Sequence, residues 1–283
     1  MNARFSRLRG GLRVGADFFS RRAILAPANV DCPRGLVDRI EDLDSGTFDV
    51  SRIHPAIVVF FEDTGALELL IKSHWVFPFS LAWRLVRAFL RLVGQFVLPI
   101  REGRIATRVF GIDREQDGRS DARGVVRTYQ ETSEVMQVAA YATHQDAQGR
   151  RYMSAAFPMP GGNITGILRL DRIEGAQGED QDGRLAIALT SLPKRHPNGQ
   201  SERDAAGVWF VSGRWLIRAP LHEQIEMWAS AMPSRPASLD PKVFDGTTIV
   251  AKHEQRLFGV RFVTHHYWFR QRRCADTIVG LRE

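Results

Sequence analysis

The chain has 283 residues, of which 44% are hydrophobic, 25% charged and 10% aromatic, and its formal net charge is +7. These average fractions exclude a mainly disordered, collagen-like or coiled-coil protein, and the length suits one large domain or one domain with an appendage. Two cysteines, Cys32 and Cys274, are too few for a disulfide framework and lack the spacing of a structural zinc site.

The positive charge is concentrated in two segments. Residues 1–39 contain eight arginines and three aspartates, and residues 79–108 contain six arginines and one glutamate. A basic excess confined to two segments favours an anionic partner surface, either phospholipid or nucleic acid. Two solvated faces are the alternative interpretation.

The N-terminal segment contains arginines but lacks the apolar core of a secretory signal. Its longest apolar stretch, Ala23–Ala28, is interrupted by Pro27, whereas a signal needs about 7 to 15 apolar residues. We therefore expect residues 1–50 to form a basic, loosely ordered arm, followed by a single β-rich domain at 51–275 and a tail at 276–283. The expected location is cytoplasmic, with peripheral association on the inner membrane face as an option.

A short strand at Ala56–Phe61 and a helix at Asp63–Lys72 are expected to open the domain. The most apolar segment follows, from His74 to Ile100, and is long enough to span a bilayer. Three arginines inside it would cost about 8 to 10 kcal/mol at mid-membrane, and the flanking apolar residues offset roughly half of that. The segment therefore predicts an amphipathic helix near Ser80–Val97 instead of a spanning one.

The helix spacing places Arg84, Arg87 and Arg91 on one face. In one interpretation the helix lies in a membrane interface, with Trp75 and the neighbouring aromatics Phe79 and Trp83 at the headgroup level and the arginines on anionic lipid. In a second interpretation, the helix packs on a sheet and its arginines lie in water. In a third, its apolar face docks on a protein partner.

From Gly103 onward the apolar pattern alternates with a period of two, and turn-forming residues separate the segments. The candidate strands are Arg104–Asp113, Gly124–Glu131, Val135–His144, Arg151–Phe157, Ile164–Ile173, Arg184–Leu192, Gly207–Arg218, Glu223–Trp228, Thr247–Arg256 and Val260–Arg270. No helical pattern interleaves them, which favours antiparallel pairing. The predicted fold class is mainly β (α+β): an antiparallel β-barrel or strongly bent sheet of about ten strands with one or two helices.

Two strand segments are apolar on both faces. They are Leu185–Leu189 and, apart from Gln137, Val135–Ala142. A strand that is covered on both sides suits a barrel whose interior is filled by side chains or holds a ligand, with further chain packed outside.

The last two strands place two histidines together. If they form a hairpin about Leu257-Phe258-Gly259, paired residue numbers sum to about 518, so His253 lies opposite His265 on one face. A metal would need a further ligand from another strand. The sequence therefore predicts no metal site, and it contains no cofactor-binding motif.

Two further strands carry polar rows. Arg127, Tyr129 and Glu131 share one face, and Arg169 shares a face with Asp171. These rows suit the inside of a pocket, where arginine and tyrosine fix an acidic head group and a carboxylate acts as acid or base. Cross-strand ion pairs on the solvent side are the alternative.

These patterns lead to three functional hypotheses. The first is binding of an apolar small molecule or lipid by a barrel that associates with an anionic membrane surface. The second is an enzyme of the same fold that uses Tyr129, Glu131, Asp171 or His253 for acid/base chemistry, with its catalytic set unknown. The third is a protein-interaction module that docks through the amphipathic helix. Nucleic acid is disfavoured as a partner, because the strand aromatics fall among core-type residues.

Overall fold

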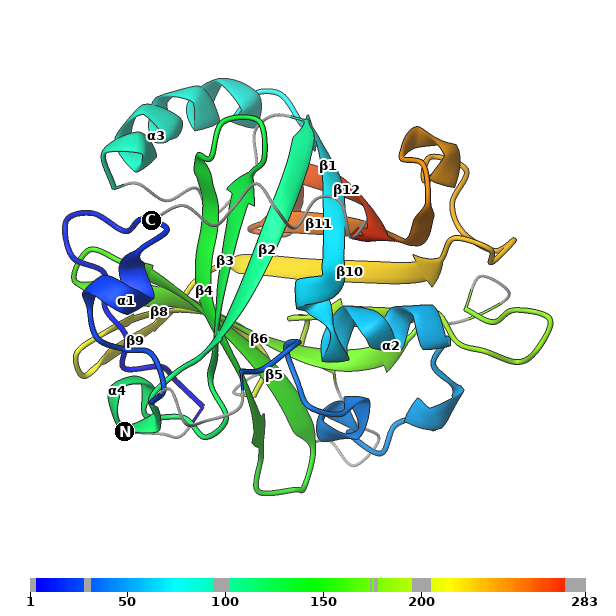
Figure 1. The fold of residues 1–283 in the computed structure, drawn as a ribbon, viewed down its shortest axis with the longest axis horizontal. Coiled ribbons are helices and arrows are strands. Elements are labelled where there is room, and N and C mark those ends of the chain that lie inside the picture. Colours follow the sequence, from blue (N-terminus) through cyan, green and yellow to red (C-terminus); the bar gives the residue numbers. More distant parts are fainter. Residues whose placement is uncertain are drawn as a thin grey trace.

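The computed structural model describes residues 4–27, 32–93, 102–173, 175, 178–194 and 205–272. Ten antiparallel strands close into a barrel in the order β5-β4-β3-β2-β1-β12-β11-β10-β7-β6, and β6 pairs back with β5 (Figure 1). Two further strands, β8 and β9, extend the sheet from β6. The mainly β, barrel-forming fold class is confirmed.

The barrel strands are β1 (Leu67–Trp75), β2 (Gly103–Gly111), β3 (Arg123–Tyr129), β4 (Val135–Gln145), β5 (Arg151–Met159), β6 (Gly162–Arg172), β7 (Ile187–Thr190), β10 (Leu221–Ala229), β11 (Thr247–Leu257) and β12 (Val260–Gln271). The extension is β8 (Gly207–Ser212) and β9 (Trp215–Arg218). The helices are α1 (Phe18–Arg21), α2 (Pro55–Glu62), α3 (Phe79–Val93) and α4 (Arg114–Asp117), with 3-10 turns η1 (Ile40–Leu43), η2 (Val50–Arg52), η3 (Thr64–Ala66) and η6 (Pro241–Val243).

The prediction of a strand at Ala56–Phe61 is wrong, because this segment forms most of α2. Pro55 occupies the first helical position, where its missing N–H costs nothing. The Nδ1 atom of His54 accepts the backbone N–H of Ala56 at 3.1 Å and caps the helix. Capping and packing of this helix thus outweigh the strand preference of its β-branched residues.

The prediction of a helix at Asp63–Lys72 is also wrong, because β1 occupies most of this range. Glu68 and Lys72 are four residues apart, a spacing that suggests a charged helical face. In the strand, Glu68 is instead buried on the outer side of the barrel, where it pairs with Arg270 of β12 at 2.7 Å. Arg270, which is 202 residues away in sequence, therefore compensates the buried charge of Glu68 in this strand.

The single strand expected at Gly207–Arg218 is two strands, β8 and β9, joined by a tight turn. Gly213 in that turn has φ +57, a left-handed conformation that glycine adopts without strain. The expected helix at Ser80–Val97 matches α3 over its described part, and residues 94–97 lie outside the described residues. The tail at 276–283 also lies outside them.

The N-terminal segment packs on the outside of the barrel. Phe5, Leu8, Phe18 and Phe19 are all buried, the last three together with outward-facing residues of β3 and β4. The expectation of a loosely ordered arm is therefore wrong for residues 4–27. The apolar side chains of this segment, which lie between its arginines in sequence, cover apolar residues on the outer face of the barrel.

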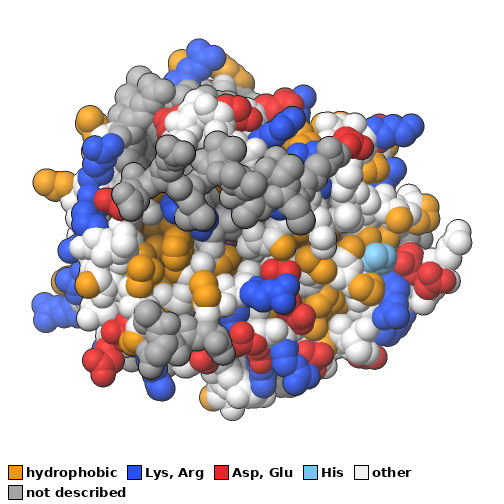
Figure 2. Space-filling model, viewed as in Figure 1, with side chains coloured by type: hydrophobic (Ala, Val, Ile, Leu, Met, Phe, Trp, Pro, Cys, Tyr) orange, Lys and Arg blue, Asp and Glu red, His pale blue; other side chains and the backbone are white. Residues whose placement is uncertain are grey.

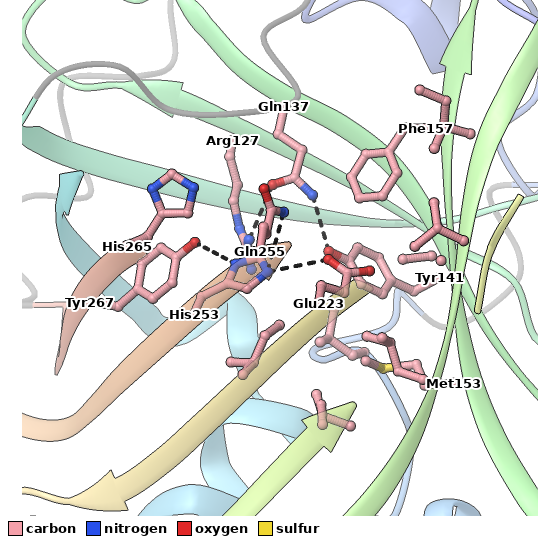
Figure 3. A pocket seen from close by; sticks show the side chains of 18 of the residues that line it. Arg127, Gln137, Tyr141, Met153, Phe157, Glu223, His253, Gln255, His265 and Tyr267 are labelled. Atoms are coloured by element: carbon pink, nitrogen blue, oxygen red, sulfur yellow. Dashed lines mark hydrogen bonds and ion pairs between the residues drawn. The ribbon is translucent and has the colours of Figure 1, made fainter. Parts of the chain in front are cut away.

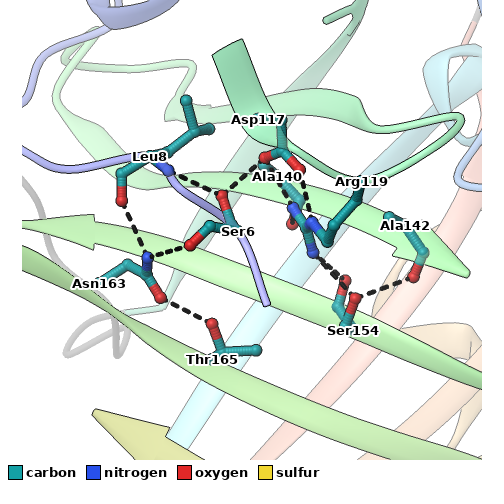
Figure 4. Close-up of polar contacts among 9 residues, drawn as sticks. All are labelled: Ser6, Leu8, Asp117, Arg119, Ala140, Ala142, Ser154, Asn163 and Thr165. Carbon is teal, nitrogen blue, oxygen red and sulfur yellow. Dashed lines mark hydrogen bonds and ion pairs between the residues drawn. The ribbon is translucent and has the colours of Figure 1, made fainter. Parts of the chain in front are cut away.

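Buried polar contacts hold this segment in place (Figure 4). The Ser6 hydroxyl donates to Asp117 at 2.6 Å, and the Asn163 amide donates to the backbone oxygens of Ser6 and Leu8 at 3.1 and 2.8 Å. Asp117 also pairs with Nε of Arg119 at 2.6 Å. The Arg119 guanidinium extends the network to hydrogen-bond acceptors on β4 and β5.

Different helices lie at the two ends of the barrel (Figure 1). α2 and the segments before it pack into the interior at the end where β1 begins, and they contribute Leu36, Ile57 and Phe61 to the main apolar core. α3 lies at the opposite end, between the end of β1 and the start of β2. One end of the barrel is therefore plugged with apolar side chains, and the other is covered by an amphipathic helix.

Candidate ligand-binding cavity

A cavity of about 440 Å³ lies inside the barrel. Most of its wall is apolar and comes from inward-facing side chains around the barrel and from both ends: Leu36, Phe60, Leu69, Trp83, Met136, Met153, Ala155, Phe157, Met159, Ile164, Leu168, Leu189, Val208, Leu221, Ile225, Met227 and Phe269. This volume falls in the range of about 300 to 1,000 Å³ that is typical of small-molecule sites. The barrel interior is therefore only partly filled by its own side chains.

His253 of β11 is the centre of one polar group on the cavity wall (Figure 3). Its Nδ1 lies 3.2 Å from the hydroxyl of Tyr267, and its Nε2 lies 3.2 Å from a carboxylate oxygen of Glu223. The amide nitrogen of Gln255 lies 3.3 Å from the same Nε2. The sheet register explains the grouping, because β10, β11 and β12 are consecutive strands of the barrel.

Tyr267 and Glu223 contact the two ring nitrogens of His253. Burial raises the pKa of Tyr267 well above its usual range, so the phenol keeps its proton. A protonated phenol can donate to or accept from Nδ1 of His253, and the Glu223 carboxylate accepts a hydrogen when Nε2 carries one. Gly166 provides the space for Glu223, since a Cβ at this glycine would lie 2.5 Å from the carboxylate.

A second polar group faces the first from β3 and β4. The Arg127 guanidinium donates to the Gln137 side-chain oxygen at 3.3 Å, and the Gln137 amide donates to the Tyr141 hydroxyl at 3.1 Å. β3 and β10 are five strands apart in the ten-stranded order. Arg127 and Glu223 therefore stand on opposite walls of the cavity.

His265 completes the polar lining. Its Nδ1 lies 2.8 Å from the Ser73 hydroxyl, and burial, followed by the charge of nearby histidines, holds its pKa well below the usual range. The ring is therefore neutral at physiological pH. Nε2 of His265, Oε1 of Gln255 and Nε of Arg127 have no hydrogen-bond partner among the described residues.

The predicted pairing of His253 with His265 is confirmed, and both side chains line the cavity. Arg127 lines it as well. Tyr129 is buried in the adjoining core and does not belong to the lining. Glu131 lies beyond the end of β3, where its exposed carboxylate accepts the backbone N–H of Arg104.

The expectation that Arg169 and Asp171 face a pocket is wrong for this cavity. Leu168 and Leu170 are the inward-facing residues of β6, so Arg169 and Asp171 point outward and pair with each other at 2.6 Å. The prediction fails because alternation assigns residues to two faces without saying which face is inside.

Sequence reasoning did not find Gln137, Tyr141, Glu223, Gln255 or Tyr267. A signal was present for part of this set, because polar residues occupy alternate positions of the last hairpin. Extending the face of His253 and His265 by two residues in each strand includes Gln255 and Tyr267. Glu223 needs the β10–β11 register, which the sequence does not fix.

The aromatics of the amphipathic helix contact the barrel. The rings of Trp75 and Trp83 stack with centroids 4.9 Å apart, and Phe79 packs against β12. Trp83 is half-buried and lines the cavity. The helix therefore covers the barrel through its aromatic face, as the sheet-packing interpretation expects.

Other apolar side chains at this end are exposed. Phe77, Leu92 and Phe258 are 79%, 76% and 78% exposed, and Leu81 and Val260 are also exposed. The edge hairpin adds Phe210, Trp215, Leu216 and Ile217. Figure 2 shows hydrophobic side chains between charged ones on one face of the molecule.

The arginines predicted to line the helix are only partly described. Arg84 is exposed, whereas the side chains of Arg87 and Arg91 lie outside the described residues. Arg256 and Arg261, which flank the β11–β12 turn, are exposed as well.

Two features are absent from the described residues. No group of three or more histidine, cysteine, aspartate or glutamate side chains there is placed to hold a metal ion. Within the same residues, no helix has both the length and the apolar character that crossing a bilayer requires.

Comparison with known proteins gives one similarity. No protein-family model matches the chain, and no solved structure matches it significantly. The uncharacterized membrane protein YndJ of Bacillus subtilis (strain 168) is 26% identical over 265 residues, which is 93% of this chain and 42% of YndJ. The chain thus spans less than half the length of that protein, and the match by itself assigns neither a family nor an activity.

Proposed function

We propose that the barrel binds an apolar small molecule or lipid in its interior. The observation that carries this proposal is the cavity of about 440 Å³ with its mainly apolar wall. Apolar walls that face unfilled space lose contacts that an apolar occupant would make. An apolar occupant restores these contacts, whereas water finds few hydrogen-bond partners on such walls.

Native mass spectrometry of protein purified from its own host tests this proposal, followed by organic extraction of the bound material. A stoichiometric apolar molecule is the expected result. Ala155→Phe places a ring inside the cavity and is expected to abolish the bound mass, while Ala147→Phe, in the exposed β4–β5 turn, keeps it. A wild-type protein that carries no ligand and fails to take up apolar probes would refute the proposal.

The proposed binding takes place at an anionic membrane surface. Exposed apolar side chains surround the barrel end that α3 covers, and arginines accompany them. This combination is typical of interfacial membrane association. The name of YndJ, a membrane protein, is consistent with such a location.

Flotation on liposomes tests the proposed association with an anionic membrane surface. Phosphatidylglycerol-containing vesicles are expected to carry the protein upward, and pure phosphatidylcholine vesicles to carry less. Phe258→Glu with Val260→Glu removes the exposed apolar pair of the β11–β12 turn and is expected to reduce flotation. Val243→Glu, an exposed apolar position at the opposite end, is the matched control. Absence of wild-type flotation on both vesicles would exclude this association.

A second candidate function is acid/base chemistry in the same cavity. The observation that favours it is the contact of His253 with Glu223, since a carboxylate that orients an imidazole is a recurring arrangement for proton transfer. Incubation of the extracted ligand with wild-type protein and with His253→Gln tests this function by mass spectrometry. A product that only the wild type forms supports an enzyme, and an unchanged ligand supports a binding protein.

A further inference from the structure

The charges on the cavity wall balance each other. Arg127 and Glu223 are the two formally charged side chains among the residues that line it, and the buried ring of His265 is neutral. With histidines counted as neutral, the net formal charge of the wall is zero. An ion brought into this space leaves one uncompensated charge in a low-dielectric interior, which is costly, whereas an uncharged polar group does not.

The polar and apolar parts of the wall are also separated along the barrel. His265 and the residues near it lie toward the end covered by α3, where Trp83 enters the lining. At the other end, Leu36 and Phe60 come from the plug that contains α2. A ligand with one polar end and one apolar chain thus matches the cavity with its polar end toward α3.

The polar atoms without partners define what that end provides. Nε of Arg127 and Nε1 of Trp83 are donors and lack an acceptor among the described residues, while Oε1 of Gln255 is an acceptor and lacks a donor. The Nε2 atom of the neutral His265 serves either role. A hydroxyl or amide group both donates and accepts, so it satisfies this set, whereas a carboxylate only accepts and an ammonium only donates.

We propose that the ligand is a single-chain amphiphile with an uncharged, hydrogen-bonding head group, held between Arg127 and Glu223 with its chain directed toward α2. This inference rests on the proposed function and adds the chemical class of the ligand. A volume of about 440 Å³ fits one chain with a small head and is too small for a two-chain phospholipid.

Competition among three matched probes tests the head-group class. The uncharged fluorophore N-phenyl-1-naphthylamine is displaced near neutral pH by 1-dodecanol, dodecanoate or dodecylammonium, which share one chain length. For the wild type, the alcohol is expected to bind at least about tenfold more tightly than either ion, or about 1.4 kcal/mol. Glu223→Gln removes the negative charge with little change of shape and is expected to shift preference toward dodecanoate by a similar factor. Arg127→Gln is expected to shift it toward dodecylammonium.

Glu226→Gln is the matched control, because Glu226 lies on the same strand, contacts Lys252 and does not line the cavity. It is expected to leave the ranking unchanged. A wild type that prefers dodecanoate or dodecylammonium overturns the head-group inference while the proposed function stands, and so does an unchanged ranking in both folded charge variants. If neither variant folds, the wild-type ranking decides. Failure of the fluorophore and all three probes to bind refutes the proposed function itself.

Discussion

Replacing Asp117 by asparagine tests how the N-terminal segment is held to the barrel. Asp117 and Arg119 are 0% and 1% exposed, and the carboxylate accepts hydrogen bonds from Arg119 and from the Ser6 hydroxyl. Asparagine preserves the shape but turns one acceptor into an NH₂ group that faces donors. It also leaves the Arg119 charge buried with neutral acceptors alone. We expect a strong loss of stability at nearly constant volume.

The magnitude follows from the burial of the pair. Removing one partner of a buried ion pair costs about 3 to 5 kcal/mol. At about 2 to 4 °C per kcal/mol for a domain of this size, Asp117→Asn should lower the melting temperature by roughly 6 to 20 °C. Circular dichroism during heating and urea unfolding measure this change. Glu41→Gln breaks an exposed pair with Arg39 and is the control, with an expected cost of less than about 1 kcal/mol.

A double variant separates buried charge from lost packing. Asp117→Leu with Arg119→Met removes both charges together, and it should be closer to the wild type than Asp117→Asn is. If Asp117→Asn unfolds within about 1 kcal/mol of the wild type, the network in Figure 4 does not stabilise the fold as argued. If the double variant is the least stable of the set, packing and not charge burial explains the effect.

Other predictions concern the cavity and the histidines. Trp83 lines the cavity, so binding of 1-dodecanol in the cavity should change the tryptophan fluorescence. Trp83→Phe should remove most of that change. Trp215→Phe, at an exposed position, should leave it. Equal responses of the two variants would place the ligand elsewhere. Burial, the largest cause, lowers the pKa of His144 and of His266 to about 4, and it also holds the pKa of His265 well below its usual range. Below about pH 6.5 the unfolded chain therefore binds more protons than the folded protein does. The contribution of these histidines to the free energy of unfolding should be complete above that pH, and it should be lost as the pH falls through about 4. Urea midpoints across this range measure the loss, and a midpoint that rises on acidification would contradict the assignment.

The sequence alone determined the fold class and one local pairing. Alternation from Gly103 onward predicted antiparallel strands, because successive side chains of a strand point to opposite faces. The opposition of His253 and His265 followed from treating the last two strands as a hairpin, although its exact register depends on the turn between Leu257 and Val260 and on a register shift between Gln255 and Arg256. Both results depend on residues that are close in sequence.

Only the tertiary structure decided which faces are inside and which distant strands meet. Arg127 and Glu223 come from opposite walls, so their shared cavity exists only after β6 pairs with β5 and closes the barrel. The α2 and β1 segments were misread for the same reason, because His54, far-away Arg270 and the core decide their structure. Alternation is symmetric between the two faces of a strand, and closure of the barrel, which distinguishes them, is a property of all the strands together.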